Sequence, residues 1–599
     1  MRQQERQRPG TLAQFTEWTA GQYGRLPALR CRSRDGDGWT QTCYDGLRDA
    51  VRAVGRGLIT LGVRPDDRVA ILAETRPEWT HAHFGALAAG AVVVPVYPTA
   101  GEDELAWVLG DSAASVVVCE NAAQAARVEA VRAKLPGLRH LVLIDGDGGA
   151  ARIPVLGHLP AGAPLEELLA RSAARRSEDL CTIVYTSGTT GLPKGCRLTH
   201  GNIVANQDAT AHLSEGGPGD TTYLYLPLAH ILGQLIELTA LRRGGTLCYF
   251  GGRVENVVAE LAEVRPTHLP SVPRLFEKVH ATVVSLAEAR GPDGPAWLAA
   301  AVRTGLAVAE ARARGEEPDE ELRAAWEAAE KSLFAPVRAI FGGRLRWALT
   351  GAAPIAPQTL DLLRACGIAV YEGYGMTESS GVITLNHRDA VRYGTVGRPV
   401  QGCEVRIAED GEVLARGPGV FPGYHGNPAA TAEALDAQGW LHTGDVGTLD
   451  ADGYLSITGR KKDLIITSSG KNLTPSLVEF ALQQSRWISR AVMVGDRRPY
   501  PVALLTLDAG EIEAWAAREG VVFEDAGPAR HPAVRRLCQE AVDAANEQVA
   551  RPARIRAFTV LDEDFGVASG ALTPTLKIRR AAISRRYAAE IDALYERGR

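Results

Sequence analysis

The chain has 599 residues, of which 45% are hydrophobic and 23% charged, and its formal net charge is −5. This length exceeds what one hydrophobic core needs, and the composition is that of a globular protein with several domains. The small negative charge excludes a general electrostatic attraction to nucleic acid.

The start of the chain and its cysteines indicate where the protein works. The first ten residues, MRQQERQRPG, are polar, so we expect no secretory signal. Nine cysteines are scattered without a CxxC pair or a zinc-ligand spacing, which predicts reduced thiols. The most apolar stretch, residues 84–96, is too short to span a bilayer and predicts a buried helix followed by a strand. We therefore expect a cytoplasmic protein, with peripheral contact at the inner face of the membrane left open.

Residues 67–145 alternate between apolar runs of strand length and amphipathic runs of helix length. The runs RVAILAE, AVVVPVY, SVVVCE and HLVLID have strand character, and the segments between them have helix character. This alternation is typical of a parallel sheet covered by helices. It predicts a doubly wound α/β subdomain.

A glycine-rich run, YTSGTTGLPKG, occupies residues 185–195. A predicted strand at 180–185 precedes it, and a helical pattern begins at Leu198, so the run connects two ordered elements. Glycines allow close backbone approach, hydroxyls donate, and Lys194 adds positive charge, which together predict an anion-binding loop for the phosphates of ATP. The loop is not a Walker loop, because Pro193 precedes Lys194 and Gly195 follows it.

The rest of the chain predicts further structural parts. Residues 281–334 are rich in Ala, Glu and Arg with a break at 316–318, and we expect a helical insertion of two solvent-exposed helices there. From about residue 391, glycines and short alternating runs predict small β-structure. The charged stretch GRKKDLI at 459–465 marks a boundary, and the segment after it has its own strands and helices, including AVMVGD and PVALLTLD.

Seven short motifs follow one another along nearly the whole chain: TSGTTGLPKG, LPLAH (226–230), TGAAP (350–354), YEGYGMTES (371–379), GWLHTGDVG (439–447), GRKKDLIITSSGKNLTPSLVE (459–479) and LTPTLK (572–577). Together they resemble the AMP-forming adenylating superfamily, and among its members most closely the long-chain fatty acyl-CoA synthetases. The resemblance implies an adenylate-forming region at 1–459, a hinge at 460–462 and a small mobile α+β domain at 463–599. It also implies two steps, formation of acyl-AMP and pyrophosphate from ATP, then transfer of the acyl group to a thiol.

The resemblance assigns nucleotide contacts to residues in both regions. Phosphate binding falls to the glycine-rich run and its lysine, namely Thr186, Ser187, Gly188, Thr189, Thr190 and Lys194. Tyr374 would stack on adenine, and Gly351 and Ala352 would cover its other face. Asp445 would accept hydrogen bonds from the ribose hydroxyls, and Arg460 would reach the ribose or the phosphates.

The catalytic residues are assigned in the same way. A carboxylate that approaches a triphosphate needs cations and donors, and Lys577 of LTPTLK would bridge the two anions. Many relatives have glycine where this chain has Leu576, but long-chain acyl-CoA synthetases often share the departure. Glu378 would bind Mg²⁺ and Thr377 would donate to the α-phosphate.

The remaining assignments concern the second step and the acid. Lys462 would be the hinge whose rotation exchanges Lys577 for the loop 468–472, in which Gly470 lines the thiol tunnel. His230 would line the acyl pocket. Residues 224–236 contain no Asp or Glu that could pair with the amino group of an amino acid substrate. This favours an aliphatic carboxylate as the substrate.

The sequence thus predicts a long-chain fatty acid–CoA ligase that uses ATP, Mg²⁺ and coenzyme A. The main alternative is a fatty acyl-AMP ligase that loads the phosphopantetheine arm of an acyl carrier protein. A third hypothesis, a catalytically dead binding relative, requires the loss of at least one of Lys194, Glu378, Asp445 and Lys577, and all are present. Acyl chain length and oligomeric state cannot be read from the sequence.

Overall fold

A computed structural model describes residues 8–33, 38–146, 153–160, 162–186, 192–213, 215–468, 471–523, 527–566, 569–573 and 577–596. The chain divides into two compact units, each described below by itself. The first holds the described residues up to Thr186 together with Leu192–Val405 and Ala415–His442. The second holds Arg406–Leu414 and the described residues from Thr443 onward.

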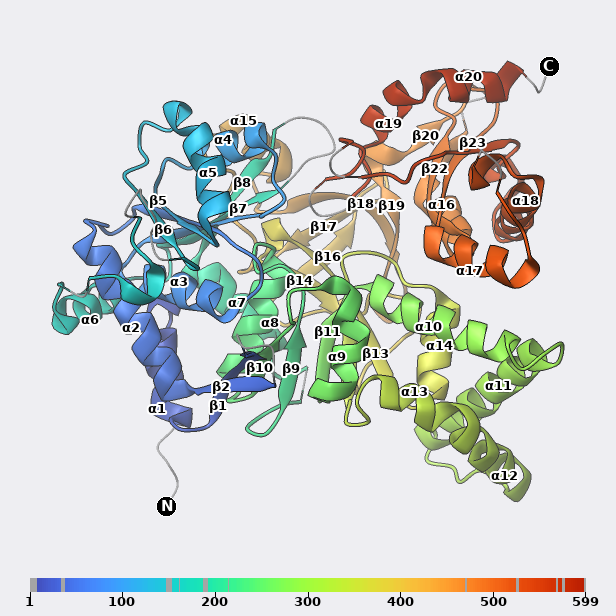
Figure 1. Cartoon of the computed structure of the whole chain (residues 1–599), viewed down its shortest axis with the longest axis horizontal. Helices are drawn as coiled ribbons and strands as arrows, with labels where there is room; N and C mark the ends of the chain where they lie inside the picture. Colours follow the sequence, from blue (N-terminus) through green and yellow to red (C-terminus); the bar gives the residue numbers. More distant parts are fainter. Residues whose placement is uncertain are drawn as a thin grey trace. The chain divides into compact units, whose positions relative to one another are not determined.

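The first unit contains a six-stranded sheet in the order β6-β5-β3-β4-β7-β8, of which Figure 1 labels β5, β6, β7 and β8. Its strands β3 (Arg68–Leu72), β4 (Val92–Val96), β5 (Ala114–Cys119) and β6 (His140–Leu143) are parallel. The helices α3 (Pro77–Ala88), α4 (Glu102–Asp111) and α5 (Ala122–Ala130) connect them in turn. The alternation in residues 67–145 therefore predicted this part of the fold correctly, and the continuous valine runs reflect strands buried on both faces.

Strands β7 (Leu180–Thr186) and β8 (Lys194–Thr199) form an antiparallel pair beside β4. The sequence predicted β7 and a helix from Leu198, and that helix is α7 from His200, but the strand β8 before it was missed. The helix α7 (His200–Ala211) begins only after a capping box in which Thr199 and Asn202 bind each other's backbone amides. The glycine-rich run therefore connects two antiparallel strands.

A second sheet of the first unit has nine strands in the order β15-β14-β13-β12-β11-β9-β10-β1-β2. Its central strands are parallel: β1 (Pro27–Arg32), β9 (Thr221–Leu224), β10 (Thr246–Tyr249), β11 (His268–Ser271), β12 (Trp347–Thr350) and β13 (Ala369–Met376). The edge strands are antiparallel to their neighbours: β2 (Trp39–Cys43), β14 (Gly381–Leu385) and β15 (Arg398–Pro399).

One buried cluster joins the two sheets of the first unit. It contains Val69 and Ile71 from β3, Phe84 from α3, and Leu247 and Tyr249 from β10. The further helices of this unit are α1 (Phe15–Tyr23), α2 (Tyr44–Thr60), α6 (Leu165–Ala173), α8 (Ile231–Arg242), α9 (Val257–Val264), α13 (Ala335–Ile340), α14 (Pro357–Ala365) and α15 (Pro428–Ala434). A shared core fixes the glycine-rich hairpin of one sheet relative to the strand ends of the other.

The predicted helical insertion consists of α11 (Gly294–Ala313) and α12 (Glu320–Ala329), which follow α10 (Pro273–Glu288) at the edge of the first unit (Figure 1). The break expected at 316–318 lies between α11 and α12. The expectation of solvent-exposed helices holds for only one face of α11, since Ala301, Gly305 and Val308 are buried.

The predicted small β-structure is a four-stranded sheet in the order β16-β17-β18-β19. These strands are β16 (Glu404–Ile407), β17 (Glu412–Arg416), β18 (Leu441–Leu449) and β19 (Leu455–Arg460). The later part of the second unit contains β20 (Ile465–Ile466), β21 (Asn472–Leu473), α16 (Pro475–Gln483), β22 (Ile488–Val494), β23 (Val502–Leu507), α17 (Ala509–Glu519), α18 (Pro532–Glu547), β24 (Phe558–Val560), α19 (Arg580–Arg586) and α20 (Ala588–Glu596). The strands predicted from AVMVGD and PVALLTLD are β22 and β23, which pair antiparallel.

All nine cysteines lie in described residues and are free thiols, as the sequence predicted. The apolar stretch 84–96 forms the end of α3 and β4 and is buried throughout. In the described part of the chain, no helix combines the length and apolarity needed to cross a bilayer.

Gly305 of α11 tests how closely α11 packs on α14. A Cβ added at Gly305 would lie 2.6 Å from the carbonyl oxygen of Ala365, a backbone atom that cannot move aside easily. We therefore expect Gly305→Ala to lower the free energy of unfolding by about 1–3 kcal/mol, although alanine favours helix over glycine. Scanning calorimetry would detect this as a lower unfolding temperature.

Gly110 of α4 provides the matched control, because a Cβ added there meets nothing closer than 3.8 Å. Gly110→Ala should leave stability unchanged or raise it by up to about 1 kcal/mol. The same unfolding temperature for both variants would contradict the close contact between α11 and α14.

Candidate functional site

The two ends of the glycine-rich run are held opposite each other. Thr186 is the last residue of β7, Lys194 is the first residue of β8, and the two pair across the antiparallel ladder. The indole Nε1 of Trp107 donates to the carbonyl oxygen of Pro193 at 2.8 Å and fixes the run just before Lys194. Four residues predicted to bind phosphate lie outside the described residues: Ser187, Gly188, Thr189 and Thr190.

A short turn, Thr377–Ser379, follows β13 and carries Thr377 and Glu378. Both side chains are buried, and the Glu378 residue is only 8% exposed. The hydroxyl of Tyr424 donates to Glu378 Oε1 at 2.7 Å. The Nζ of Lys194 lies 5.1 Å from the centre of the Tyr424 ring, which makes a cation–π contact. The structure thus brings Lys194 and Glu378 to the same tyrosine.

Backbone hydrogen bonds hold the segment around Tyr424 against both motifs. The amide of His425 donates to the carbonyl oxygen of Gly195 in β8 at 2.7 Å, and the amide of Phe421 donates to that of Glu378 at 2.8 Å. Residues 421–425 therefore join β8 to the Thr377–Ser379 turn through main-chain contacts that do not depend on any side chain.

The electrostatics of this cluster favour a protonated tyrosine. Burial raises the pKa of Tyr424, and the nearby Glu378 carboxylate raises it further. Burial and the same carboxylate raise the pKa of the Cys196 thiol, which lies in β8 with its Sγ 3.8 Å from Thr186 Oγ1. Both groups therefore keep their protons, and Tyr424 is a donor to Glu378.

The donor set at Glu378 fits magnesium better than a transition metal. Among the described residues, no group of three or more His, Cys, Asp and Glu side chains could hold a metal ion. Magnesium is commonly held by one or two carboxylates together with water and substrate phosphates, so a single buried carboxylate beside a phosphate-binding lysine suits it.

The predicted adenine contacts lie together at the ends of β12 and β13. Thr350, the last residue of β12, pairs with Glu372 of β13, which places Gly351 beside Gly373. A Cβ on Gly351 would lie 3.1 Å from the carbonyl oxygen of Gly373, so a larger residue would crowd this strand end. Ala352 has φ of 70°, a left-handed conformation that costs an alanine free energy and is typical of functional sites. Tyr374 lies in β13, one residue beyond Gly373.

His230 caps the helix α8. Its Nδ1 accepts a hydrogen bond from the amide of Leu232 at 3.2 Å, so the neutral ring carries its proton on Nε2. This capping role is a structural function that the sequence reasoning did not predict, and the expected contact with the acyl pocket stays a prediction.

In the second unit the structure brings together Asp445 and Arg460. The two residues pair across β18 and β19, and the Arg460 Nε lies 3.0 Å from Asp445 Oδ1. Asp445 is buried, whereas Arg460 is partly exposed. The neighbouring Lys461 binds Asp410 at 2.5 Å and Glu412 at 3.0 Å, which anchors the start of the predicted hinge to β17 and the turn before it.

The two lysines assigned to the two steps are both exposed. Lys462 lies in the short helix Lys461–Asp463. The backbone amide of Lys577 donates to Oγ1 of the fully buried Thr573 at 3.0 Å, so its main chain is fixed while its side chain reaches solvent. Gly470 lies outside the described residues.

The sequence reasoning missed Tyr424. It lies in FPGYHGN, a stretch of turn residues without strand or helix periodicity, and none of the recognised motifs includes it. Only the pairing of this stretch with β8 in three dimensions reveals its position next to Lys194 and Glu378.

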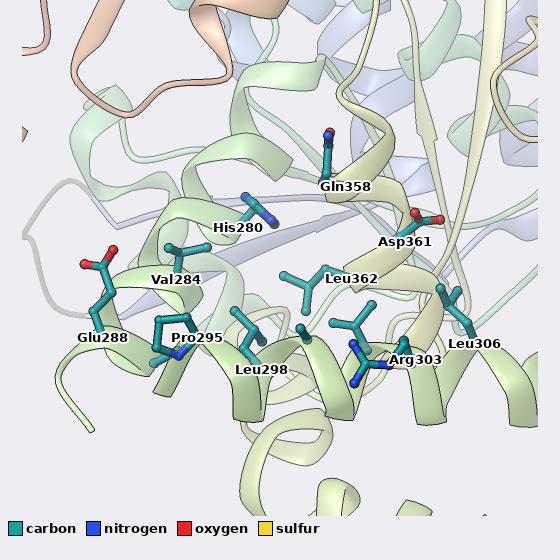
Figure 2. A pocket seen from close by; sticks show the side chains of 13 residues that line it. His280, Val284, Glu288, Pro295, Leu298, Arg303, Leu306, Gln358, Asp361 and Leu362 are labelled. Atoms are coloured by element: carbon teal, nitrogen blue, oxygen red, sulfur yellow. The ribbon is translucent and has the colours of Figure 1, made fainter. Parts of the chain in front are cut away.

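A separate pocket of about 450 Å³ lies between α10, α11 and α14. Figure 2 shows that His280, Leu298 and Leu362, one from each helix, face a common space. No residue predicted to bind nucleotide or to act in catalysis lines this pocket. The candidate site is therefore the cluster around Lys194, Tyr424 and Glu378.

Comparisons with known proteins identify the family of this chain. Residues 16–425 match the model of the AMP-binding enzyme family, and residues 462–599 match the model of the AMP-binding enzyme C-terminal domain. The long-chain-fatty-acid–CoA ligase FadD15 of Mycobacterium bovis is 39% identical over 565 residues, which cover 93% of each chain. The long-chain-fatty-acid–CoA ligase ACSBG2 of Xenopus laevis is 32% identical, over 98% of this chain and 84% of the relative.

Among solved structures, the adenylation domain of a carboxylate reductase from Mycobacterium chelonae superimposes with a TM-score of 0.75. It is 22% identical, and the match covers 98% of this chain and 92% of that domain. At this identity the likeness supports the fold, which is the mixed α/β arrangement that the sequence predicted.

Glu372 provides a pH-dependent test of the strand end that carries Tyr374. Its carboxylate accepts from the amide of Gly394 at 2.9 Å, and burial raises its pKa from 4.5 to about 7. Between these values the folded state holds a proton that the unfolded state has lost, so this group makes stability fall as pH rises from 4.5 to 7. We expect the free energy of unfolding of Glu372→Gln, which stays neutral and keeps an acceptor, to exceed that of the parent by up to about 3 kcal/mol above pH 7.

Chemical unfolding of both proteins at several pH values would measure the difference. The gain should be largest above pH 7 and should disappear near pH 4.5. A constant difference across this range would show that Glu372 titrates normally in the folded chain.

Proposed function

The chain belongs to the AMP-binding enzyme family, and we propose that it is an AMP-forming long-chain fatty acid–CoA ligase. In the proposed reaction a fatty acid carboxylate attacks the α-phosphorus of ATP and releases pyrophosphate. The thiol of coenzyme A then attacks the acyl carbonyl and releases AMP. Relatives that match over nearly the whole chain are named long-chain-fatty-acid–CoA ligases, which supports this choice of substrates.

The observation that carries the proposal is the meeting of Lys194 and Glu378 at Tyr424. Attack of a carboxylate on a triphosphate brings two anions together, and the barrier falls when positive charge is already in place. Lys194 holds the β- and γ-phosphates in this proposal, and Thr186 donates to them. Glu378 would bind Mg²⁺, which neutralises phosphate charge when it is bound.

The other residues of the first unit position the substrates. Tyr374 stacks on adenine, and Gly351 and Ala352 leave room on its other face. Thr377 donates to the α-phosphate, and His230 lines the pocket for the acyl group. These residues lie in β13 or follow β9, β12 and β13, which are strands of the nine-stranded sheet.

The second unit supplies the groups that differ between the two steps. Asp445 accepts from the ribose hydroxyls and Arg460 supports it, which is consistent with their 3.0 Å ion pair. Lys577 stabilises the anions in the first step. Rotation at Lys462, within a hinge at 460–462, withdraws Lys577 and brings Gly470 to the thiol tunnel for the second step.

Coenzyme A is the proposed acceptor, rather than the phosphopantetheine arm of an acyl carrier protein, because relatives that match over most of both chains are named CoA ligases. The proposed location is cytoplasmic. Peripheral contact of the protein with the inner face of the membrane would give it access to fatty acid dissolved there. The chain keeps Lys194, Glu378, Asp445 and Lys577, which argues against a dead relative.

The direct test incubates the purified chain with ATP, Mg²⁺ and saturated fatty acids of increasing length. Coenzyme A and a phosphopantetheinylated carrier protein are supplied in separate reactions, and mass spectrometry identifies the thioester. We expect acyl-CoA, AMP and pyrophosphate. Thioester on the carrier alone would show the fatty acyl-AMP ligase instead, and ADP in place of AMP would exclude both.

Lys577 tests the proposed division of labour. Lys577→Ala removes the cation of the first step, so ATP–pyrophosphate exchange should fall by at least about 100-fold. Thioester formation from supplied acyl-adenylate should stay within about threefold of the parent, because the second step does not use this group. Arg585→Ala, which removes an exposed cation from the same unit, should change neither step.

Lys462→Pro should have the opposite effect. Proline restricts φ at the hinge, so exchange should persist while thioester formation from acyl-adenylate falls about tenfold or more. Rapid quench measurements separate the two half-reactions. Parallel losses in both half-reactions for both variants would rule out two roles for two lysines.

A further inference from the structure

Tyr424 makes two contacts of different kinds with two oppositely charged groups. Its ring lies 5.1 Å from the Lys194 ammonium, and its hydroxyl donates to Glu378 Oε1 at 2.7 Å. Lys194 and Glu378, both described, form no ion pair with each other within 4.0 Å. Tyr424 therefore contacts both the Lys194 ammonium and the Glu378 carboxylate, two opposite charges that attract each other at a half-buried site.

The position of Tyr424 is fixed from two sides. Its neighbour His425 binds the β8 backbone at Gly195, and Phe421 binds the backbone of Glu378 itself. The backbone amide of Tyr424 itself donates to Thr431 Oγ1 at 2.9 Å. These hydrogen bonds hold the backbone on which the Tyr424 side chain contacts Lys194 and Glu378.

We propose that Tyr424 is a positioning residue that keeps Lys194 and Glu378 from neutralising each other, so that the lysine stays available for phosphate and the carboxylate for Mg²⁺. This inference rests on the proposed function. The ring gives the ammonium a weak partner that a phosphate displaces, because cation–π contacts at partly exposed sites are modest. The hydroxyl holds one carboxylate oxygen and orients the other.

The chemistry of the hydroxyl supports this role. A buried carboxylate needs a donor, and the Tyr424 hydroxyl supplies one at 2.7 Å without adding charge. A lysine or arginine in its place would pair with Glu378 directly and compete with a divalent cation. A neutral donor on a rigid ring satisfies the carboxylate and leaves its charge for the metal.

Two variants separate the two contacts. Tyr424→Phe keeps the ring over Lys194 and removes the hydroxyl from Glu378, whereas Tyr424→Leu removes both contacts. Tyr223→Phe is the matched control, because the Tyr223 hydroxyl donates to the Glu260 carboxylate at the same distance of 2.7 Å and both residues are buried away from the site. Each full-length variant is studied by calorimetric titration with ATP, with and without Mg²⁺, by ATP–pyrophosphate exchange at increasing Mg²⁺ concentration, and by thermal unfolding.

For Tyr424→Phe we expect ATP binding without Mg²⁺ to stay within about twofold of the parent, while the Mg²⁺ concentration that half-saturates ATP–pyrophosphate exchange rises about tenfold. For Tyr424→Leu we expect ATP binding without Mg²⁺ to weaken about fivefold as well, because Lys194 can then pair with Glu378. Tyr223→Phe should change neither quantity.

A merely structural tyrosine would give a different pattern. If Tyr424→Phe weakened ATP binding equally with and without Mg²⁺, in step with its unfolding temperature, the proposal would be overturned. Unchanged Mg²⁺ dependence in Tyr424→Phe would overturn it too. A parent chain that binds ATP but never exchanges pyrophosphate would refute the ligase function alone, since the titrations with and without Mg²⁺ still decide the role of Tyr424. A parent chain that binds no ATP would overturn both.

Discussion

The backbone hydrogen bonds of residues 421–425 hold together the parts of the first unit on which the proposed chemistry depends. On one side they bind β8, whose first residue is Lys194, and on the other they bind the turn that carries Glu378. These two segments are far apart in the sequence and belong to different sheets. This connection brings Lys194 and Glu378 to the same tyrosine, which the proposed sharing of a phosphate and its cation requires.

The fold supplies the rest of the constraint. The hairpin of β7 and β8 extends a parallel sheet whose strands are buried on both faces, so its base cannot shift without disturbing the core. Ala352 adopts a left-handed backbone beside a strand end where Gly351 meets Gly373 closely. Strain of this kind persists only where the surrounding packing imposes it, which fits a preformed surface for a flat ring such as adenine.

The sequence alone predicted much of this fold for identifiable reasons. Alternating strand and helix runs between residues 67 and 145 predicted the parallel sheet, because such strands must be apolar on both faces. Strand β8 was missed because GCRLT is short and follows a glycine run, where local signals indicate only a turn. Tyr424 was missed because its position comes from contacts with Lys194 and Glu378, which are distant in the sequence and which no local pattern encodes. The motif residues, by contrast, were recognised through their order along the chain, and their chemical roles remain predictions.

The central claim is that this chain joins a carboxylate oxygen to the α-phosphorus of ATP. Fatty acid labelled with oxygen-18 in its carboxylate, supplied with ATP, Mg²⁺ and coenzyme A, tests it directly by mass spectrometry of the nucleotide product. The account predicts AMP that carries a single labelled oxygen, because the bridging oxygen stays on phosphorus when the thiol attacks the carbonyl. Unlabelled AMP, or label found in pyrophosphate or inorganic phosphate, would contradict it.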